Sequence, residues 1–468
     1  MPAHWTETIF ARASGPGKAG VAVFRLSGET AFAVAERLCG ALPPLRSAGM
    51  RKICALDGEL IDIGLVIPFK GPNSFTGEDV VELHLHGSPA VETALYEALG
   101  RAGARPAEAG EFTRRALVNG KLDLAEVEGL ADLLDAETIL QRKQALGQLG
   151  GRLSDTAEGW RKRLLTIMAP LEADIDFPDE DDVPAAVAAR AGPAIKALID
   201  ELETHRAAAG RARAIREGVA VAIIGAPNAG KSSLLNRLVG SDRAIVSETP
   251  GATRDAIEVR LDLGGVLVTL VDTAGLRSHT DDAIEIEGMR RTRIKADEAV
   301  IRIQIIDPND TIVSNPAPAG EGVSVSRETP GAGGSDLMRP GDFIVYNKSD
   351  LYPDASAPPP VAGPTGMTVW RMSAKTGAGV EAFVAGLTDA VAAHAGADDG
   401  ALLSRERHAA AVDRALEGLR AALSRLDQAP ELAAEDVRLA ARALGSITGA
   451  VDVEDVLGEI FSSFCIGK

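Results

Sequence analysis

The stretch Val221-Ala-Ile-Ile-Gly-Ala-Pro-Asn-Ala-Gly-Lys-Ser-Ser233 decides the fold of the central part of this chain. An apolar strand runs into a glycine-rich turn, and Leu234-Leu235 then begin the apolar spacing of a helix. Glycine lets such a turn curl so that successive N–H groups face one point, and the N-terminus of the helix adds positive charge. The pattern predicts a phosphate-binding loop, in which Lys231 reaches the outer phosphates and Ser232 binds Mg²⁺.

Two later strands end in polar turns that are suited to reading a base. Phe343-Ile-Val-Tyr-Asn-Lys-Ser-Asp350 ends in a carboxylate, which can accept both the ring N–H and the exocyclic amine of guanine, an edge that adenine lacks. We expect Asn347 and Lys348 to brace this turn, and Ser373-Ala-Lys375, after the strand Met367-Thr-Val-Trp370, to close the other side. Following a phosphate-binding loop, this order indicates GTP.

Two segments between these motifs are expected to respond to the terminal phosphate. One is Val268-Thr-Leu-Val-Asp-Thr-Ala-Gly275, in which a strand ends at Asp272. Asp272 can hold Mg²⁺ through water, and Gly275 offers an N–H to the γ-phosphate. Thr253 is the second hydroxyl expected on Mg²⁺. The predicted GTP-binding residues are Asn228, Ala229, Gly230, Lys231, Ser232, Ser233, Ser247, Glu248, Thr249, Pro250, Gly251, Ala252, Thr253, Asp272, Thr273, Ala274, Gly275, Asn347, Lys348, Ser349, Asp350, Ser373, Ala374 and Lys375.

Length and composition favour a cytoplasmic enzyme with about three domains. The chain has 468 residues and only three scattered cysteines, which suggests no disulfide framework and a reducing compartment. The N-terminus lacks the basic start and apolar core of a signal peptide, and no apolar run approaches the length of a membrane span. We therefore expect a soluble protein.

The order of strands and helices predicts an α/β and α multidomain chain. Short strands and helices alternate up to about residue 119, with strands at 20–26 and 80–86 and a helix at 30–38. Helical periodicity then flanks the nucleotide-binding part on both sides, at 122–149 and 401–464. The expected domains are an α+β domain at 1–119, a helical domain in two halves at 120–218 and 394–468, and a Ras-like P-loop GTPase domain inserted at 219–393.

Motifs outside the nucleotide-binding part resemble those of one family. They are Thr8 to Val21 with Phe24-Arg-Leu-Ser-Gly28, Ser74 to Glu82, Ala109 to Ala125, and the last four residues, Cys465-Ile-Gly-Lys468. Together with the GTPase motifs they resemble the MnmE (TrmE) tRNA-modification GTPases over nearly the whole chain. The resemblance implies a K⁺-stimulated homodimer that works in a heterotetramer with the flavoprotein MnmG. It also implies that the complex adds an aminomethyl or carboxymethylaminomethyl group at C5 of the wobble uridine of certain tRNAs.

The same resemblance assigns roles to residues that their types alone do not settle. The family takes its one-carbon unit from 5-formyl- or 5,10-methylene-tetrahydrofolate, and its folate-contacting positions match Arg25, Glu82, Lys121 and Lys468. Its K⁺ site matches Asn228, Ser247, Thr249 and Ala252, although the family usually has threonine at the last position. Leu276 stands where signalling GTPases have the glutamine that orients water, so Glu285 takes that role, with Glu287 as its competitor. Cys465 is a candidate catalytic thiol.

Several observations keep alternatives open. A ribosome-assembly or regulatory GTPase switch is the main alternative, and folate-dependent one-carbon transfer without RNA is another. The net charge is −18, with an acidic cluster at 174–182 that is expected to be a solvated loop, so tRNA contact requires a local basic patch. The Gly/Pro-rich stretch 308–342 is expected to be a surface excursion. Candidate RNA-binding arginines, or else solvated helix faces, are Arg206, Arg211, Arg213 and Arg216, or Arg114 and Arg115.

Overall fold

The computed structural model describes residues 7–176, 184–226, 228–245, 258–272, 294, 297–308, 338–351, 361–362, 366–396, 400–426, 428–450 and 467. The chain divides into two compact units. The first comprises residues 1–134, 146–202 and 410–468, and the second comprises 135–145 and 203–409. Apart from 135–145, the second unit is one insertion into the sequence of the first, which agrees with the predicted architecture. The expected domain boundaries after residues 119, 218 and 393 stay predictions.

The first unit begins with a mixed sheet whose strand order is β3-β4-β5-β2-β1-β6. All neighbouring strands are antiparallel except β1 and β6. Side chains at 22, 24 and 26 of β2 alternate toward a core that helices α1 and α2 share, as period-2 strands require. The strands are β1 (Ile9–Arg12), β2 (Ala19–Ser27), β3 (Gly49–Cys54), β4 (Leu60–Phe69), β5 (Val80–Gly87) and β6 (Arg105–Pro106), and the helices are α1 (Ala31–Cys39) and α2 (Pro89–Arg101).

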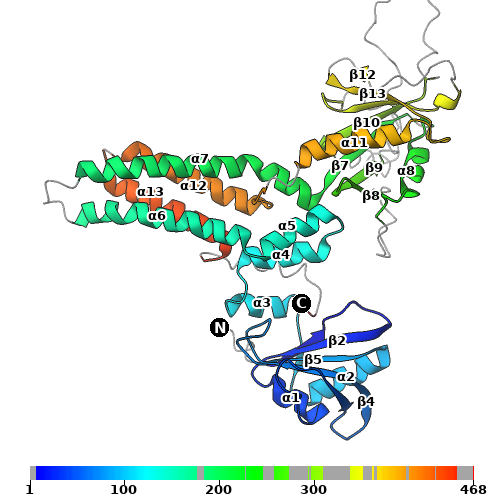
Figure 1. Cartoon of the computed structure of the whole chain (residues 1–468), viewed down its shortest axis with the longest axis vertical. Helices are drawn as coiled ribbons and strands as arrows, with labels where there is room; N and C mark the ends of the chain where they lie inside the picture. Colours follow the sequence, from blue (N-terminus) through cyan, green and yellow to red (C-terminus); the bar gives the residue numbers. More distant parts are fainter. Residues whose placement is uncertain are drawn as a thin grey trace, which may run out of the picture. The chain divides into compact units, whose positions relative to one another are not determined.

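Long helices make up the rest of the first unit. Helices α6 and α13 pack along each other, with α7 and α12 beside them (Figure 1). The buried indole of Trp160 donates to Glu201 Oε1 at 2.7 Å, which ties α6 to α7 inside this bundle. The helices are α3 (Glu111–Val118), α4 (Leu124–Asp135), α5 (Ile139–Leu149), α6 (Arg152–Asp176), α7 (Pro184–Glu217), α12 (Glu406–Arg425) and α13 (Pro430–Thr448); α7 and α12 both continue into the second unit, as does the start of α5.

The helical periodicity predicted for 122–149 is divided between two helices. Helix α5 has its own start, where the backbone N–H of Gln141 donates to Thr138 Oγ1 at 3.4 Å and Gln141 Oε1 accepts from the N–H of Thr138 at 3.1 Å. This reciprocal pair is a capping box, which begins a new helix even though the apolar spacing continues through it. A similar pair between Asp123 and Glu126 begins α4.

The second unit is built on a sheet in the order β12-β13-β11-β10-β7-β9-β8. Strands β9, β7, β10, β11 and β13 are parallel, as expected for a nucleotide-binding α/β domain, and β8 and β12 are antiparallel edge strands. The strands are β7 (Val219–Gly225), β8 (Glu258–Leu263), β9 (Val266–Asp272), β10 (Ile301–Ile306), β11 (Phe343–Tyr346), β12 (Val361–Ala362) and β13 (Thr368–Arg371). The helical elements are α8 (Lys231–Val239), the 3-10 turn η3 (Ser349–Leu351) and α11 (Val380–Ala395).

One face of this sheet carries both α8 and α11. Val221 and Ile223 of β7 share a core with Leu234 of α8 and Phe383 of α11, whereas the alternate residue Ile224 belongs to a separate cluster. Packing α8 against the strand that precedes it fixes the loop between them at the carboxyl edge of the parallel strands. Among the helices that the structure describes, none combines the length and the apolar character needed to cross a bilayer.

Candidate functional site

The glycines of the predicted phosphate-binding loop, between β7 and α8, are required by close packing. A Cβ on Gly225 would lie 2.4 Å from the carbonyl oxygen of Ile305 in β10. Gly230, at the N-cap of α8, has a φ of 102°, and a Cβ there would lie 2.0 Å from Asn347 Nδ2. Asn228 also has a positive φ, of 66°, which asparagine tolerates better than most residues. The loop conformation therefore explains the glycine spacing in the sequence.

Lys231 begins α8 with its side chain folded back over this loop. Its buried ammonium donates to the carbonyl oxygens of Gly225 at 2.7 Å and Ala226 at 3.0 Å. A cation at a helix N-terminus, beside a curled glycine-rich loop, is an arrangement that fits phosphate. Ser232 and Ser233 are exposed in the first turn of the same helix, so the hydroxyl predicted to bind Mg²⁺ is accessible.

Asn347 links the phosphate-binding loop to both turns that were predicted to read the base. Its buried side chain donates from Nδ2 to the carbonyl oxygen of Ala229 at 2.8 Å. Its Oδ1 accepts from the backbone N–H of Ala374 at 2.9 Å. The structure thus brings both turns to a phosphate-binding loop that lies more than a hundred residues before them, and these two bonds are how Asn347 connects the three motifs.

The neighbouring polar residues hold the rest of this turn. Lys348 has a positive φ of 61°, and its ammonium contacts Asp307 Oδ2 at 2.6 Å. Asp350 accepts at Oδ1 from the hydroxyl of Ser373 at 2.6 Å, so a serine of one turn orients the carboxylate of the other. Asp350 is exposed, which leaves its carboxylate open to a ligand.

Two contacts at this site involve residues that the sequence analysis did not select. Arg237, in the last turn of α8, donates to the carbonyl oxygen of Ala374 at 2.6 Å and to that of Lys375 at 2.5 Å. Asp307, directly after β10, is the partner of Lys348. Asp307 could have been identified from the sequence, because it is an acid directly after an apolar strand. Nothing in the local sequence marks Arg237, because its partners lie 137 and 138 residues away.

Many of the predicted site residues lie outside the described part of the chain. Asp272 is described as the last residue of β9, without its side chain. Most of 308–342, and the acidic cluster beyond residue 176, are likewise not described. The predicted site residues outside the described part are Ser247, Glu248, Thr249, Pro250, Gly251, Ala252, Thr253, Thr273, Ala274, Gly275, Glu285, Cys465 and Lys468, together with Leu276 and Glu287.

In the first unit, two of the residues matched to folate contacts pair with each other. Arg25 of β2 lies opposite Glu82 of β5 and donates to Glu82 Oε1 from Nη2 at 2.8 Å and from Nε at 3.1 Å. The Arg25 guanidinium also lies over the ring of Phe75, 5.2 Å from its centroid, and 5.9 Å from that of Phe112. A carboxylate acceptor beside a cation and flat apolar rings fits a planar ligand that carries N–H donors.

Lys121, in the segment that follows α3, lies beside Gly77. A Cβ on Gly77 would lie 3.3 Å from Lys121 Cγ, so glycine leaves room for the stem of that lysine. His84 and His86 make carboxylate contacts, with Nε2 of His84 3.4 Å from Glu82 Oε2 and Nδ1 of His86 2.9 Å from Asp62 Oδ1. The structure therefore places His84 next to the Arg25–Glu82 pair.

A buried ionic network supports the same region. Arg115 donates to Glu78 Oε2 at 3.0 Å and to Glu111 Oε1 at 3.1 Å, and Arg105 donates to Glu111 Oε1 at 2.6 Å. Burial raises the pKa of Glu111, but the hydrogen bonds that its carboxylate accepts from Arg105, the N–H of Glu108 and Arg115 outweigh burial and lower the pKa from 4.5 to about 2. Because Arg115 is buried in this network, it does not form an exposed basic patch.

The one described residue of the C-terminal tail contacts the N-terminal sheet. Gly467 is buried and has a φ of 104°, and a Cβ there would lie 1.9 Å from the carbonyl oxygen of Arg12 and 3.3 Å from Ala13 Cα. Only glycine fits this approach. Gly467 therefore lies against the end of β1, in the same unit as the Arg25–Glu82 pair.

Comparison with known proteins identifies the family. Family models match the GTP-binding protein TrmE N-terminus at residues 8–121 and the MnmE helical domain at residues 124–465. The chain is 47% identical to "tRNA modification GTPase MnmE" of Caulobacter vibrioides, over 99% of this chain and 100% of that one. It is 48% identical to the protein of the same name from Parvibaculum lavamentivorans, again over 99% and 100%.

Similarity to solved structures is lower. The G domain of the T. maritima FeoB iron transporter is 22% identical, with a TM-score of 0.24 over 38% of this chain and 99% of that one, which is too low to support an argument. The full-length relatives and the two family models, together with the nucleotide-binding geometry, carry the assignment. This chain belongs to the MnmE family of tRNA modification GTPases.

Proposed function

We propose that this chain hydrolyses GTP to drive a modification at C5 of the wobble uridine of certain tRNAs. It would act in the cytoplasm as a homodimer, within a heterotetramer with the flavoprotein MnmG, and add an aminomethyl or carboxymethylaminomethyl group. The observation that carries the proposal is the joining of the phosphate-binding loop to both base-reading turns through Asn347. Near-complete alignment with the tRNA modification GTPases supports the RNA substrate.

The described residues are suited to separate tasks on GTP. Asp350, held by Ser373, would accept the two N–H groups of guanine and so reject adenine, which lacks them. Lys231 would exchange its carbonyl partners for the outer phosphates. Ser232 would hold Mg²⁺ with Thr253, and the metal would neutralise charge on the phosphates.

Potassium and a glutamate would complete the hydrolytic site. Asn228, Ser247, Thr249 and the backbone at Ala252 would hold K⁺, whose charge stands in for an arginine finger. Glu285 would orient the attacking water, with closure of its segment as the step that completes the site. GTP turnover would then drive motion of the protein rather than carry the transferred carbon.

The one-carbon unit would come from 5-formyl- or 5,10-methylene-tetrahydrofolate bound in the N-terminal domain. Glu82 would accept N–H donors of the pterin ring, while Arg25, Lys121 and Lys468 would hold its anionic parts. The packing of Gly467 against Arg12 supports a tail that reaches this domain, because it leaves Cys465 only two residues from a fixed point in the same unit. Cys465 would be the thiol used in the modification.

Nucleoside mass spectrometry of tRNA tests this function. Cells that lack the chain should lose the C5 modification, and re-expression of the chain should restore it. Re-expression of an Asp350→Asn variant should not, because guanine recognition is removed. Wobble uridines that stay modified in the deletion strain would contradict the proposal and favour a regulatory GTPase.

The potassium site has its own test. GTP hydrolysis by the purified chain should be faster in K⁺ than in Na⁺, and Asn228→Ala should remove that difference while GTP still binds. Equal rates in the two salts would exclude the role given to Asn228 and would leave the tRNA assignment standing.

A further inference from the structure

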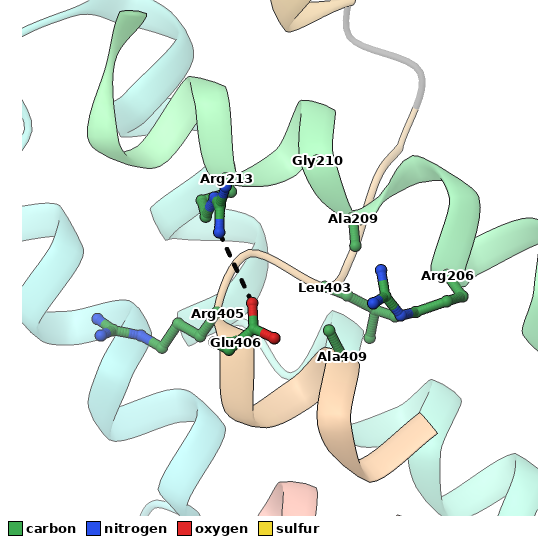
Figure 2. Close-up of a pocket in the computed structure, with 8 residues that line it drawn as sticks. All are labelled: Arg206, Ala209, Gly210, Arg213, Leu403, Arg405, Glu406 and Ala409. Carbon is green, nitrogen blue, oxygen red and sulfur yellow. Dashed lines mark ion pairs between the residues drawn. The ribbon is translucent and has the colours of Figure 1, made fainter. Parts of the chain in front are cut away.

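Arginine side chains line a cavity in the second unit, and its lining shares no residue with the predicted GTP site. It lies between the last turns of α7 and the segment that leads into α12, and its volume is ≈ 230 Å³. Figure 2 shows Arg206 and Arg213 on α7, with the Arg213 guanidinium directed at Glu406 on the facing segment. Both walls belong to the stretch 203–409, so the cavity is complete within one unit.

The spacing along α7 creates the opening. Arg206, Gly210 and Arg213 lie at positions i, i+4 and i+7, so they share one face of the helix. A Cβ on Gly210 would meet no atom within 4 Å, which means that the space between the two arginines is open rather than filled by packing. Buried Leu403 closes the far side, and the Arg206 side chain extends toward it (Figure 2).

The charge around the cavity contrasts with that of the whole chain. Residues 205–216 contain four arginines and no acid, in a protein whose net charge is −18. The acid in the cavity lining is Glu406, whose carboxylate lies 3.6 Å from Arg213 Nη1, and both side chains are exposed, at 77% and 55%. An ion pair this exposed is weak, so another anion can replace the carboxylate.

The size of the cavity limits the kind of anion. Pockets for whole small-molecule ligands are usually ~300–1,000 Å³, larger than the ≈ 230 Å³ found here. The cavity has room for a single phosphate group and is below the usual size for a whole ligand. Arginine guanidinium groups bind phosphate through two parallel N–H donors, and phosphate contacts supply most of the sequence-independent affinity for nucleic acids.

We propose that this cavity holds a backbone phosphate of the tRNA, between Arg206 and Arg213, with Glu406 displaced. The proposal rests on the proposed function, because it takes the RNA substrate from there. It gives a strongly acidic protein a local basic contact for RNA, and it selects the α7 arginines over Arg115, which is buried in an ionic network. A free phosphate ion has the same chemistry, so the experiment must separate the two sources.

The test measures binding of fluorescently labelled tRNA, extracted from cells that lack the chain, to the full-length protein between about 50 and 200 mM salt. The double variant Arg206→Gln/Arg213→Gln should bind roughly three- to tenfold more weakly, and its slope of log affinity against log salt should fall by about 0.8, the value for one phosphate contact. Glu406→Gln should bind more tightly, because it removes one of the two carboxylates that pair with Arg213, the other being Glu217 at 3.8 Å. Arg161→Gln is the matched control, since Arg161 is also a helix arginine in a partly exposed ion pair, 3.0 Å from Glu158.

Each outcome decides the proposal. GTP hydrolysis and melting temperature should stay unchanged in the double variant, which shows that any loss of tRNA binding is local. Unaltered affinity and salt slope in that variant, or no tRNA binding by the unaltered chain, would overturn the proposal. A third result would also overturn it: inorganic phosphate stabilises the unaltered chain but not the double variant, while the two bind tRNA equally well. The cavity would then be a site for a small anion. The proposed function is judged separately, by the tRNA nucleosides of the deletion strain.

Discussion

Replacing Asn347 by alanine should weaken guanine-nucleotide binding although the side chain is directed at protein rather than at ligand. Asn347→Ala removes the hydrogen bonds to the carbonyl oxygen of Ala229 at 2.8 Å and from the N–H of Ala374 at 2.9 Å. Each bond contributes about 1 kcal/mol, and each buried partner left without a bond costs about 1–3 kcal/mol. For the two bonds the cost is therefore at least about 2 kcal/mol.

That amount is smaller than the total stability of a typical domain, about 5–15 kcal/mol, so the variant should still fold. The loss should appear in binding, because the phosphate-binding loop and the base-reading turns are no longer held in one arrangement. Since about 1.4 kcal/mol corresponds to a tenfold change, affinity for GDP should fall at least roughly thirtyfold. Titration of the full chain with a fluorescent GDP analogue measures this, and thermal melting measures the stability.

Two companion variants make the result specific. Asn236→Ala is the same chemical change on the exposed side of α8, and it should alter stability by less than about 0.5 kcal/mol. Gly230→Ala should be harmful alone, because its Cβ would lie 2.0 Å from Asn347 Nδ2, and less harmful in the Asn347→Ala background, where that atom is absent. GDP affinity of Asn347→Ala within twofold of the unaltered chain would refute the reasoning.

Three further predictions rest on separate contacts. Asp350→Asn should lower GTP affinity at least about a hundredfold without raising ATP affinity, because the amide cannot accept from both N–H groups of guanine; competition binding with the two nucleotides checks this. Because the pKa of Glu111 is about 2 in the folded chain, against 4.5 ordinarily, its stabilisation is complete above pH 4.5 and is lost as the pH falls toward 2. Urea unfolding against pH should show a loss of about 3 kcal/mol over that range, and Glu111→Gln should flatten it. Gly467→Ala should reduce tRNA modification in cells while GTP hydrolysis stays normal, because a Cβ 1.9 Å from the Arg12 carbonyl oxygen displaces the tail but touches nothing in the nucleotide site.

Local pattern predicted the elements that carry the nucleotide. The apolar run before Gly225 and the apolar spacing after Lys231 correspond to β7 and α8, and the strand expected before Asn347 is β11. These predictions succeeded because strand, turn and helix are each determined by neighbouring residues. The apolar spacing of 122–149 was less informative, since a capping box at Thr138 interrupts the helix without changing the spacing.

Contacts between distant segments could not be predicted in the same way. The pairing of Arg25 with Glu82 depends on the register of β2 against β5, and no short motif specifies that register. The role of Arg237 depends on how α8 packs on the sheet, which brings its last turn to residues 374 and 375. The sequence therefore predicted which residues have the chemistry for a site, and the fold determined which of them meet.

The contacts around Asn347 also imply that base and phosphate are not recognised independently. Asn347 links Ala229 in the phosphate-binding loop to Ala374 in the turn whose Ser373 holds the base-reading carboxylate, and Arg237 of α8 donates to the carbonyl oxygen of Ala374. A ligand that orders one of these segments therefore helps to order the others. The binding free energies of guanosine and pyrophosphate, measured separately, should therefore add up to much less than the binding free energy of GTP. Each fragment alone must order the connected loops, whereas GTP orders them once.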